Sequence, residues 1–300
     1  EADWLVGING TRAMTAFNSK DGGFFLTTVG RVQTPTLAIV MEREEKINAF
    51  VSRPYWEVHA KVQCEAGQYD AVWFDPVFKK NEEDPHQKAE RIWSKEDAQR
   101  ICKLIEGQTA SVKQSAKRTT QLSPLLFDLT SLQREANNRF GFSAKTTLAL
   151  AQALYEKHKA LTYPRTDARA LPEDYLGTVN NTLDMLKESS RYMKSVGEIQ
   201  KHKWVKPSKR IFDNSKISDH FAIIPTLQAP KKLTEAEEKI YDLVVKRFLA
   251  VFFPAAEYDV TTRITTVADQ NLKTEGKVLV KAGWLEVYGR GTEEAETLVP

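Results

Sequence analysis

Cysteine is nearly absent from this 300-residue chain, which contains only Cys64 and Cys102. Two cysteines exclude a disulfide-stapled scaffold and a cysteine-rich zinc site. Long apolar runs are missing too, because none approaches the roughly 18 to 20 residues that a membrane helix needs. No segment resembles a signal peptide. These absences favour a globular protein of the reducing cytoplasm that has no membrane partner.

A large charge excess is also missing, since the formal net charge of +3 is too small to indicate nucleic-acid binding by itself. The stretch 191–216 is different, with eight basic residues against two acidic ones. Three aromatic residues are interleaved with them: Tyr192, Trp204 and Phe212. Cations neutralise phosphates and aromatic faces stack on unpaired bases. The stretch is therefore either a single-stranded DNA surface that includes Lys201, Lys203 and Trp204, or a solvated mobile loop.

The most informative segment is 161–167, which reads Leu-Thr-Tyr-Pro-Arg-Thr-Asp. Pro164 fixes its own φ and pushes Tyr163 toward an extended conformation. In extended backbone, residues two apart point to the same side, so Tyr163, Arg165 and Asp167 are expected to share a face. A phenol titrates at about pH 10, and a fixed guanidinium can hold a phosphodiester and favour phenolate. The segment predicts transesterification onto tyrosine; the alternative is a half-buried strand tyrosine beside a solvated arginine.

The first part of the chain predicts two helices, over residues 3–17 and from Thr34 to about Ile47. Thr34 and Pro35 form a favourable helix start, with proline at the first helical position. Gly30 and Arg31 lie just upstream, where helix amides and a guanidinium could receive a phosphate. The alternative is an ordinary turn glycine followed by a surface arginine.

After these helices the apolar residues alternate with polar ones, and this change of period predicts a β-rich region. Strands are expected over 55–62, 69–74 and 110–119, with a helix between Ser94 and Gly107. Strand-like patterns reappear only at 258–267 and 277–280. We expect these late strands to return to the early sheet, which makes the intervening residues an inserted domain.

The inserted region is predicted to be mostly helical. Apolar stripes predict a helix from Leu129 to Phe140 that ends at Gly141, and a second helix capped by Ser143. Thr234 and Glu237 form a capping box before a third helix. These stripes are interpreted as core and not as cofactor sites.

Five blocks in the same order resemble the type IA DNA topoisomerases, with wording closest to the topoisomerase III branch. They are 30–37 (GRVQTPTL), 129–142 with Leu132-Gln133 and Ala136, 151–156 (AQALYE), 163–167 (YPRTD) and 218–226 (SDHFAIIPT). The resemblance implies strand cleavage by Tyr163 through a 5′-phosphotyrosyl intermediate without ATP. It also implies an α+β multidomain fold with a split β-rich arch domain.

The resemblance assigns roles to further residues. Arg165 and His220 are implied as catalytic partners of Tyr163, and His220 would donate to the scissile phosphate or hold Asp167 or Arg165 in position. A core histidine is the alternative for His220. Four residues are implied as DNA contacts: Arg31, Gln33, Gln133 and Asp167. A surface glutamine is the alternative for Gln133.

The implied organisation has three parts. Residues 1–54 form a helical DNA-groove segment, and residues 121–253 form the helical domain that carries the catalytic tyrosine. Residues 55–120 and 254–290 form the split β-rich arch, or gate, domain around a hole large enough for duplex DNA. The arch and the hole come from the resemblance alone.

The family carries an amino-terminal metal-binding module with an Asp-x-Asp pair, and no Asp-x-Asp occurs in this sequence. The chain also begins at Glu1 without a methionine, so we expect a fragment, the alternative being a complete small protein with a processed end. Mg²⁺ is then held by ligands outside this chain, with none within it. We expect a monomeric, nucleoid-associated isomerase fragment that binds single-stranded DNA and is inactive alone in relaxation.

Two other functions compete with this interpretation. One is a stand-alone single-stranded DNA-binding module in which Tyr163 is incidental. The other is a tyrosine recombinase, whose pattern needs dispersed arginines and a His-x-x-Arg element upstream of a tyrosine near the chain end. Tyr163 is central in the sequence, so the recombinase ranks last.

Overall fold

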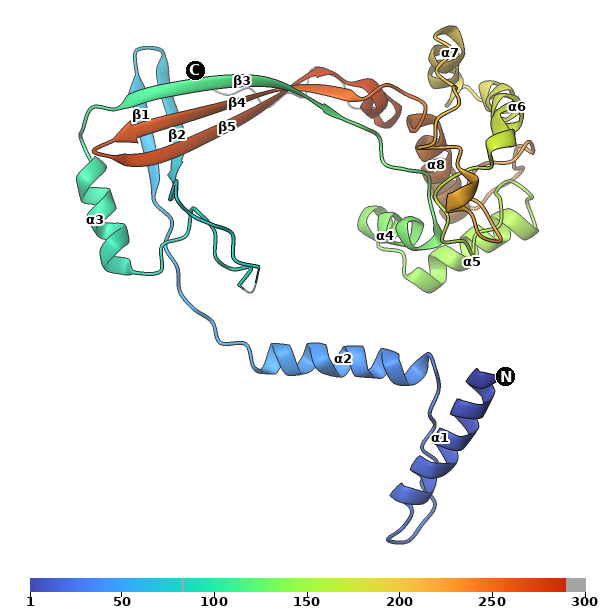
Figure 1. Ribbon diagram of the computed structural model, residues 1–300. Coiled ribbons are helices and arrows are strands. Elements are labelled where there is room, and N and C mark those ends of the chain that lie inside the picture. Colours follow the sequence, from blue (N-terminus) through green and yellow to red (C-terminus); the bar gives the residue numbers. More distant parts are fainter. Residues whose placement is uncertain (83, 290–300) are drawn as a thin grey trace. The chain divides into compact units, whose positions relative to one another are not determined.

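The computed structural model describes residues 1–82 and 84–289 of the chain (Figure 1). These residues form two compact units, one of residues 1–56 with 92–97 and the other of residues 57–82, 84–91 and 98–289. None of the described helices is both long and apolar enough to cross a membrane. Residue 290, the last of the predicted split domain, lies outside the described residues.

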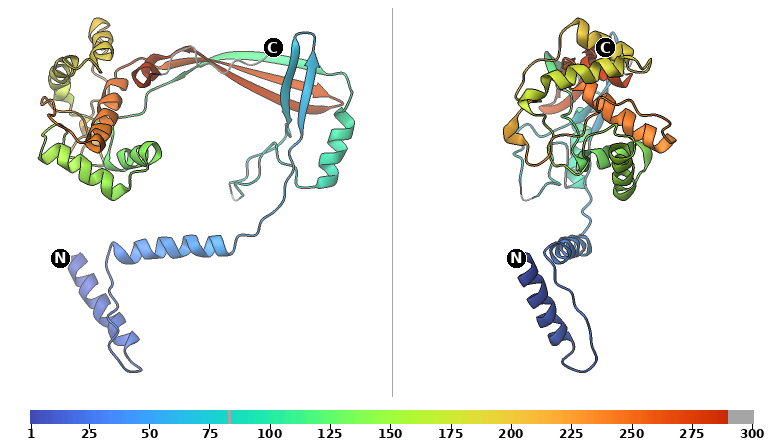
Figure 2. Two further views of the ribbon diagram at one scale, coloured as in Figure 1. Left: turned by 180° about the vertical axis from the view of Figure 1, so that it is seen from behind. Right: turned by 90° about the vertical axis from the view of Figure 1, so that its right-hand side faces the viewer.

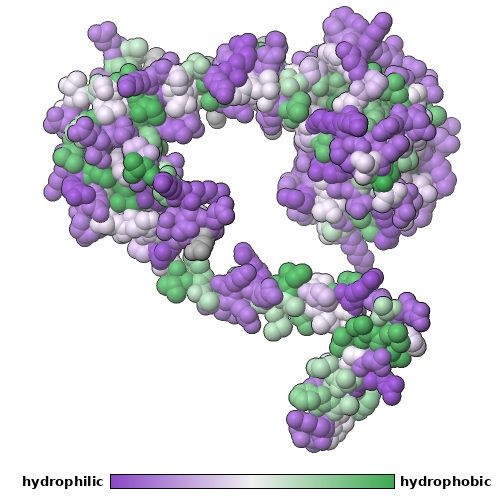
Figure 3. Space-filling model, viewed as in Figure 1, coloured by the Kyte–Doolittle hydropathy of each residue, from purple (hydrophilic) through white to green (hydrophobic). Residues whose placement is uncertain are grey.

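The first unit consists mainly of two helices, α1 (Ala2–Asn18) and α2 (Gln33–Asn48). Both predicted helices are confirmed; α1 is longer by one residue at either end, and α2 ends one residue later than predicted. Of the residues in these two described helices, only Thr15 is buried. Large apolar side chains such as Trp4 and Ile39 are 66% and 67% exposed, and Figure 3 shows green patches among purple ones on both helices. The unit therefore has almost no hydrophobic core of its own.

The start of α2 differs from the prediction. Its first residue is Gln33, so Pro35 occupies the third helical position and not the first. The Thr34 hydroxyl does not cap the helix but accepts a hydrogen bond from the Gly30 amide at 3.1 Å. The Thr34 side chain, which the sequence pattern assigned to the helix cap, thus binds the loop before α2 instead.

An antiparallel sheet of five strands belongs to the second unit, in the order β1-β2-β5-β4-β3. The return of the late strands is confirmed, since β5 pairs with β2 and β4 pairs with β3. Strand β5 is also much longer than the segment 277–280 that the sequence predicted. The strands are β1 (His59–Cys64), β2 (Gly67–Trp73), β3 (Ser111–Gln121), β4 (Ala256–Val267) and β5 (Gln270–Lys281).

Strand β1 begins later than predicted. The register pairs His59 with Val72, and the Trp73 amide donates to the Val58 carbonyl at 2.9 Å. Strand β2 ends there, so the residues before Val58 have no strand beside them. Trp56 forms only an isolated bridge with Ile92.

Strands β3, β4 and β5 run together as a long ribbon (Figure 2). Most of β3 is exposed, and ion pairs reinforce its backbone ladder, with Arg118 Nε 2.9 Å from Asp259 Oδ1. A small apolar cluster packs on this sheet and consists of Tyr69, Ala71, Val267 and Leu272. The ribbon therefore depends more on backbone pairing than on buried apolar area.

Most of the other helices lie in the second unit, and α3 (Lys95–Ile105) begins in the first unit and continues into the second. Helix α3 precedes β3, and the segment between β3 and β4 contains the others. They are α4 (Leu129–Phe140), α5 (Ala144–Glu156), η1 (Glu173–Tyr175), α6 (Leu176–Lys187), α7 (Met193–Lys201), η2 (Asn214–Lys216) and α8 (Glu235–Ala250), and η3 (Gly283–Tyr288) follows β5.

The predicted helix boundaries in this region are confirmed. Gly141 ends α4 with a left-handed φ of 70°, and the Ser143 hydroxyl accepts from the Thr146 amide to cap α5. Thr234 and Glu237 form the expected capping box on α8. Ser94 likewise accepts from the amide of Asp97 at the start of α3.

Helix α8 lies in the main core, and ten of its sixteen residues are buried. The ends of the long strands join the same core, because Ala256, Trp284 and Leu285 belong to the apolar cluster around α8. The Trp284 indole donates to the Gln121 carbonyl at 2.9 Å. The helices that carry the candidate site and the base of the ribbon therefore share one core.

Candidate active site

The tyrosine segment leaves α5 and runs beside the residues around His220. Leu161 bridges Pro225, and the Thr162 amide donates to the Ile224 carbonyl at 3.0 Å. The backbone bends at Pro164 and Arg165, so no continuous strand alternation runs through the segment. Tyr163, at the end of the extended part, is half-buried.

Side-chain hydroxyl groups fasten the tyrosine segment to the histidine segment. Thr162 Oγ1 donates to the Ala222 carbonyl at 3.0 Å and accepts from the Ile224 amide at 2.9 Å. Thr166 Oγ1 donates to the His220 carbonyl at 3.1 Å. Two segments more than fifty residues apart in sequence are thus held in a fixed alignment.

Three rings meet at the nucleophile candidate. The rings of Tyr163 and His220 are 4.3 Å apart between centroids and tilted by 42°. On another side, the Tyr155 ring of α5 is edge-on to Tyr163 with centroids 5.4 Å apart. The proximity of His220 to Tyr163 agrees with the prediction, and His220 is exposed and not a core histidine.

Arg165 reaches the same helix as Tyr163. Its Nη2 lies 3.4 Å from Oε1 of Gln152, one turn before Tyr155 on α5. Residues three apart on a helix lie on one face, so Tyr163 and Arg165 both contact one face of α5. Arg165 and Asp167 are exposed, and neither forms an ion pair within the described residues. The Arg165 guanidinium is available to an anion.

A pocket of about 500 Å³ opens beside these residues. Tyr155, Tyr163 and His220 form part of its wall, together with Tyr175 and Phe221. Lys159 and Gln228 also line it. Its place next to the tyrosine makes it part of the candidate site.

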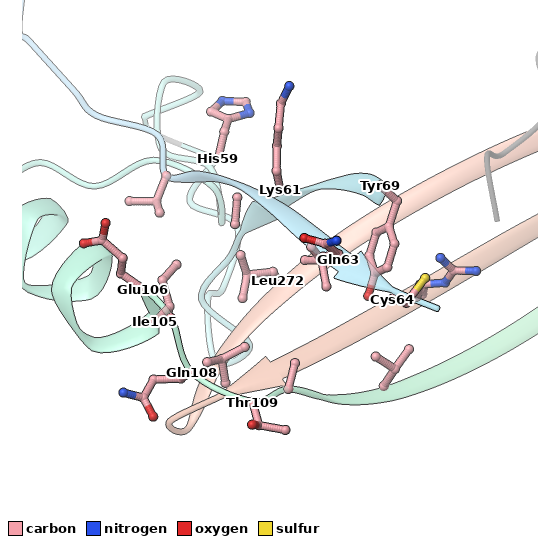
Figure 4. Close-up of a pocket in the computed structure, with 18 of the residues that line it drawn as sticks. His59, Lys61, Gln63, Cys64, Tyr69, Ile105, Glu106, Gln108, Thr109 and Leu272 are labelled. Atoms are coloured by element: carbon pink, nitrogen blue, oxygen red, sulfur yellow. The ribbon is translucent and has the colours of Figure 1, made fainter. Parts of the chain in front are cut away.

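A larger pocket of about 1080 Å³ lies on the sheet, against β1 and the end of α3 (Figure 4). His59, Lys61, Tyr69 and Glu106 are among its lining residues. It shares no lining residue with the pocket beside Tyr163. We therefore do not assign it to the candidate active site.

The predicted DNA contacts outside the tyrosine segment belong to different units of the chain. Arg31 and Gln33 are exposed in the first unit, where Arg31 Nε lies 3.3 Å from Asp3 Oδ1. Gln133 is half-buried, and its amide donates to the Ala144 carbonyl, which ties α4 to α5. A DNA-binding role for these residues stays a prediction.

The basic stretch 191–216 combines a few buried apolar side chains with basic side chains that are mostly exposed. Tyr192 and Phe212 are only 6% and 4% exposed, so the expectation that these rings stack on DNA bases is wrong. Both point into the main apolar cluster, where burial stabilises them. Arg191 pairs with Glu238 at 2.8 Å.

The three residues of this stretch that were predicted to contact DNA lie at the end of α7. Lys201 is 3.8 Å from Glu198, and Lys203 is exposed with a φ of 52°. Trp204 is half-buried between the rings of His202 and Phe253. Contact between these three side chains and DNA stays a prediction. Lys201 and Trp204 also contact other side chains of the protein.

Sequence reasoning missed the ring contact of Tyr155 and the hydrogen bond of Gln152. The Tyr155 ring is only half-buried, which leaves part of it free for such a contact. Sequence reasoning also missed Tyr175 and Phe221, whose rings are 4.8 Å apart in the pocket wall. The available signal was the position of Tyr155, eight residues before Tyr163 at the end of a helix.

No group of three or more histidine, cysteine or carboxylate side chains that could hold a metal ion occurs within residues 1–82 and 84–289. A Mg²⁺ site with its ligands outside this chain stays a prediction. The reaction steps that the candidate site supports are those of its own side chains.

Comparison with known proteins shows which family this chain resembles. A family model described as DNA topoisomerase matches residues 1–300. The chain is 40% identical over 302 residues to DNA topoisomerase 3 of Bacillus subtilis (strain 168), covering 99% of this chain and 38% of that protein. It is also 40% identical over 300 residues to DNA topoisomerase 3 of Shouchella clausii, with the same coverage. The chain thus spans well under half the length of these curated relatives.

The fold is similar to that of a solved structure as well. Full-length topoisomerase I from Thermotoga maritima matches with a TM-score of 0.63 and 21% sequence identity. The match covers 99% of this chain and 45% of the other. At this identity the likeness concerns the fold alone.

Proposed function

This chain belongs to the DNA topoisomerase family, and from that premise we propose that its helical part carries the nucleophile of a type IA DNA topoisomerase. The enzyme cleaves one DNA strand, lets another strand pass, and rejoins the first. The chain covers 38% of its curated relatives, so this activity is proposed for the whole protein to which the chain corresponds.

One observation carries the proposal. The Tyr163 ring contacts the rings of both Tyr155 and His220, and Arg165 contacts the same helix face as Tyr163. These contacts support the proposal that a phenol, an imidazole and a guanidinium act on one phosphodiester. Arginine holds a phosphate through two parallel hydrogen bonds, and the imidazole can donate a third.

The chemistry that these groups support is an in-line transesterification. The Tyr163 phenol loses its proton, and its oxygen forms a bond to phosphorus. The bond from phosphorus to the 3′ oxygen breaks, and that oxygen takes a proton to become a hydroxyl group. The product is a 5′-phosphotyrosyl link, whose energy is close to that of the original phosphodiester, so the reverse reaction rejoins the strand without ATP.

Arg165 is proposed to hold the phosphate and to offset the charge that builds up on its oxygens. His220 is proposed to donate a hydrogen bond to the same phosphate, and Asp167, Arg31, Gln33 and Gln133 to contact the strand. The five-stranded sheet is proposed to act as the gate. Mg²⁺, if the complete protein uses it, would need ligands beyond the described residues.

Trapping a covalent adduct tests the proposal. The full-length protein is incubated with an end-labelled single-stranded oligonucleotide and then denatured, and the adduct is resolved on a gel. We expect an adduct with native protein and none with Tyr163→Phe, while binding measured by fluorescence anisotropy stays within about twofold. An adduct of undiminished yield with Tyr163→Phe would refute the assignment. A stand-alone DNA-binding module would give binding without any adduct.

The 300-residue chain by itself is proposed to bind single strands weakly and not to relax supercoils. Adding it to negatively supercoiled plasmid with Mg²⁺ tests this expectation. Efficient relaxation would show that these residues contain all the catalytic groups the reaction needs.

A further inference from the structure

We propose that the pocket beside Tyr163 binds the nucleobase of a nucleotide that flanks the phosphate attacked by Tyr163. The inference rests on the proposed function and adds a subsite to it. The pocket would stack the base against aromatic walls, so that the strand is held by one of its bases as well as by its phosphates.

The walls of the pocket are unusually aromatic. Tyr155, Tyr163, Tyr175, His220 and Phe221 all line it. None of these five side chains is fully buried, in contrast to core rings such as Phe127 and Phe248. Half-exposed rings around a cavity leave their faces available to a flat ligand, and every base has a π-face that can stack on them.

The pair Tyr175 and Phe221 forms the part of the wall that the proposed chemistry does not use. Their rings are 4.8 Å apart and tilted by 51°. Phe221 directly follows His220 in sequence, so the wall and the phosphate donor belong to one segment. Burial raises the pKa of Tyr175 above the ordinary value of a phenol, so its ring is uncharged at neutral pH. A neutral aromatic surface suits an uncharged base.

The rim supplies polar groups and a cation. Lys159 is exposed, with Nζ 5.8 Å from the centroid of the Tyr155 ring, where it can meet the phosphate next to the bound base. Gln228 and Thr178 also line the pocket and can hydrogen-bond to a base edge. An apolar pocket with a few polar groups is the usual form of a small-molecule site.

Size and position agree with this occupant. The volume of about 500 Å³ lies within the range of roughly 300 to 1,000 Å³ that is typical of small-ligand sites. Because Tyr163 itself lines the pocket, a nucleotide joined to its oxygen has its base within reach of the aromatic walls. A base that bound elsewhere in the molecule would not be linked in this way to the nucleotide on the Tyr163 oxygen.

An abasic scan tests the inference in the full-length protein. Single-stranded oligonucleotides with a mapped cleavage site carry a tetrahydrofuran residue in place of one base at each flanking position, with all phosphates kept. Binding is measured by fluorescence anisotropy with Tyr163→Phe, and adduct yield is measured with the native protein. At one flanking position we expect the abasic residue to weaken binding about tenfold.

Pocket variants then locate the effect. Tyr175→Ala and Phe221→Ala should each weaken binding of the intact oligonucleotide and remove the difference between intact and abasic strands. Tyr175→Phe keeps the ring and should retain the difference in binding between intact and abasic strands. Phe142→Ala is the matched control, because Phe142 also packs half-buried on the main core but does not line the pocket. If Tyr175→Ala fails to fold, Phe221→Ala and the scan with unaltered pocket residues decide the matter.

The outcomes separate the two proposals. Equal binding of intact and abasic strands at every position, with a normal Tyr163 adduct, would overturn the pocket and leave the proposed function standing. An abasic effect that persists unchanged in Tyr175→Ala and Phe221→Ala would place the base elsewhere and also overturn it. Absence of any adduct with the intact strand would overturn the proposed function itself.

Discussion

The ring of Tyr155 is edge-on to the ring of Tyr163, with centroids 5.4 Å apart and an angle of 78° between the planes. Tyr163 is thereby supported from α5 on one side and by His220 on another. A nucleophilic oxygen at the end of a flexible side chain reacts faster when its ring is held in the productive orientation. We interpret Tyr155 as a positioning residue for Tyr163.

Replacing Tyr155 should slow cleavage without abolishing it. An edge-to-face pair is worth about 0.5–1.5 kcal/mol, so Tyr155→Ala should lower the single-turnover rate of adduct formation roughly 2- to 10-fold. Tyr155→Phe keeps the ring and should react at nearly the native rate. Rapid-quench measurement of the adduct in the full-length protein tests this, with saturating DNA to separate rate from binding. A native rate in Tyr155→Ala would rule out the positioning role.

The Thr162 hydroxyl should contribute both stability and alignment. Thr162→Val preserves shape but leaves the Ala222 carbonyl and the Ile224 amide without that partner. An unsatisfied buried polar group costs about 1–3 kcal/mol, so the free energy of unfolding should fall by about that amount. Urea denaturation measures the change. Thr130→Val, at an exposed position of α4, is the control and should change stability by less than about 0.5 kcal/mol.

Asp213 makes stability depend on acid pH. Hydrogen bonds from Lys216 and then from the Ser215 hydroxyl lower the pKa of Asp213 to about 2. In the unfolded chain an aspartate titrates at about 3.9, so this carboxylate stabilises the fold fully above about pH 4 and loses its contribution as pH falls toward 2. In Asp213→Asn the free energy of unfolding should therefore fall less steeply between pH 4 and pH 2.

Lys216→Met checks the cause of that shift. Removing the ammonium group takes away the largest contribution, so the pKa of Asp213 should rise toward the ordinary value. A carboxyl titration followed by NMR gives the pKa directly. An unchanged titration in Lys216→Met would show that Lys216 is not what lowers it.

The elements that the sequence predicts well are those with local causes. Gly141 ends α4 and Ser143 begins α5 because left-handed φ and side-chain capping depend only on neighbouring residues. The return of β4 and β5 to the early strands was predictable, because two isolated strands with an alternating pattern need other strands to pair with. The close approach of His220 to Tyr163 was expected only through resemblance to a family.

What the sequence could not supply depends on tertiary packing. Nothing local indicates that Tyr192 and Phe212 are buried while Tyr175 and Phe221 face a pocket, since all four are aromatic residues in mixed surroundings. The bend at Pro164 and Arg165 also could not be read from strand alternation. This bend brings Arg165 to Gln152. The contact depends on where α5 ends, and the spacing of residues within the tyrosine segment does not predict it.

Gly283 should be essential for joining the ribbon to the helical core. Its φ is +51°, and a Cβ atom there would lie 2.5 Å from the Ala255 carbonyl oxygen and 2.6 Å from that of Pro254. Gly283→Ala combines a left-handed conformation, which costs about 1–2 kcal/mol, with a clash against backbone that cannot move freely. We therefore expect unfolding free energy to fall by more than about 2 kcal/mol.

A matched glycine should respond in the opposite direction. Gly197 lies inside α7, and nothing lies within 4 Å of the position that its Cβ would occupy. Gly197→Ala should stabilise the protein by about 0.5–1 kcal/mol, because alanine loses less backbone entropy in a helix. Urea denaturation of both variants compares the two changes directly. The two effects should differ because carbonyl oxygens at the base of the ribbon crowd Gly283 and not Gly197. Equal changes in the free energy of unfolding would show that the left-handed turn at Gly283 imposes no special constraint.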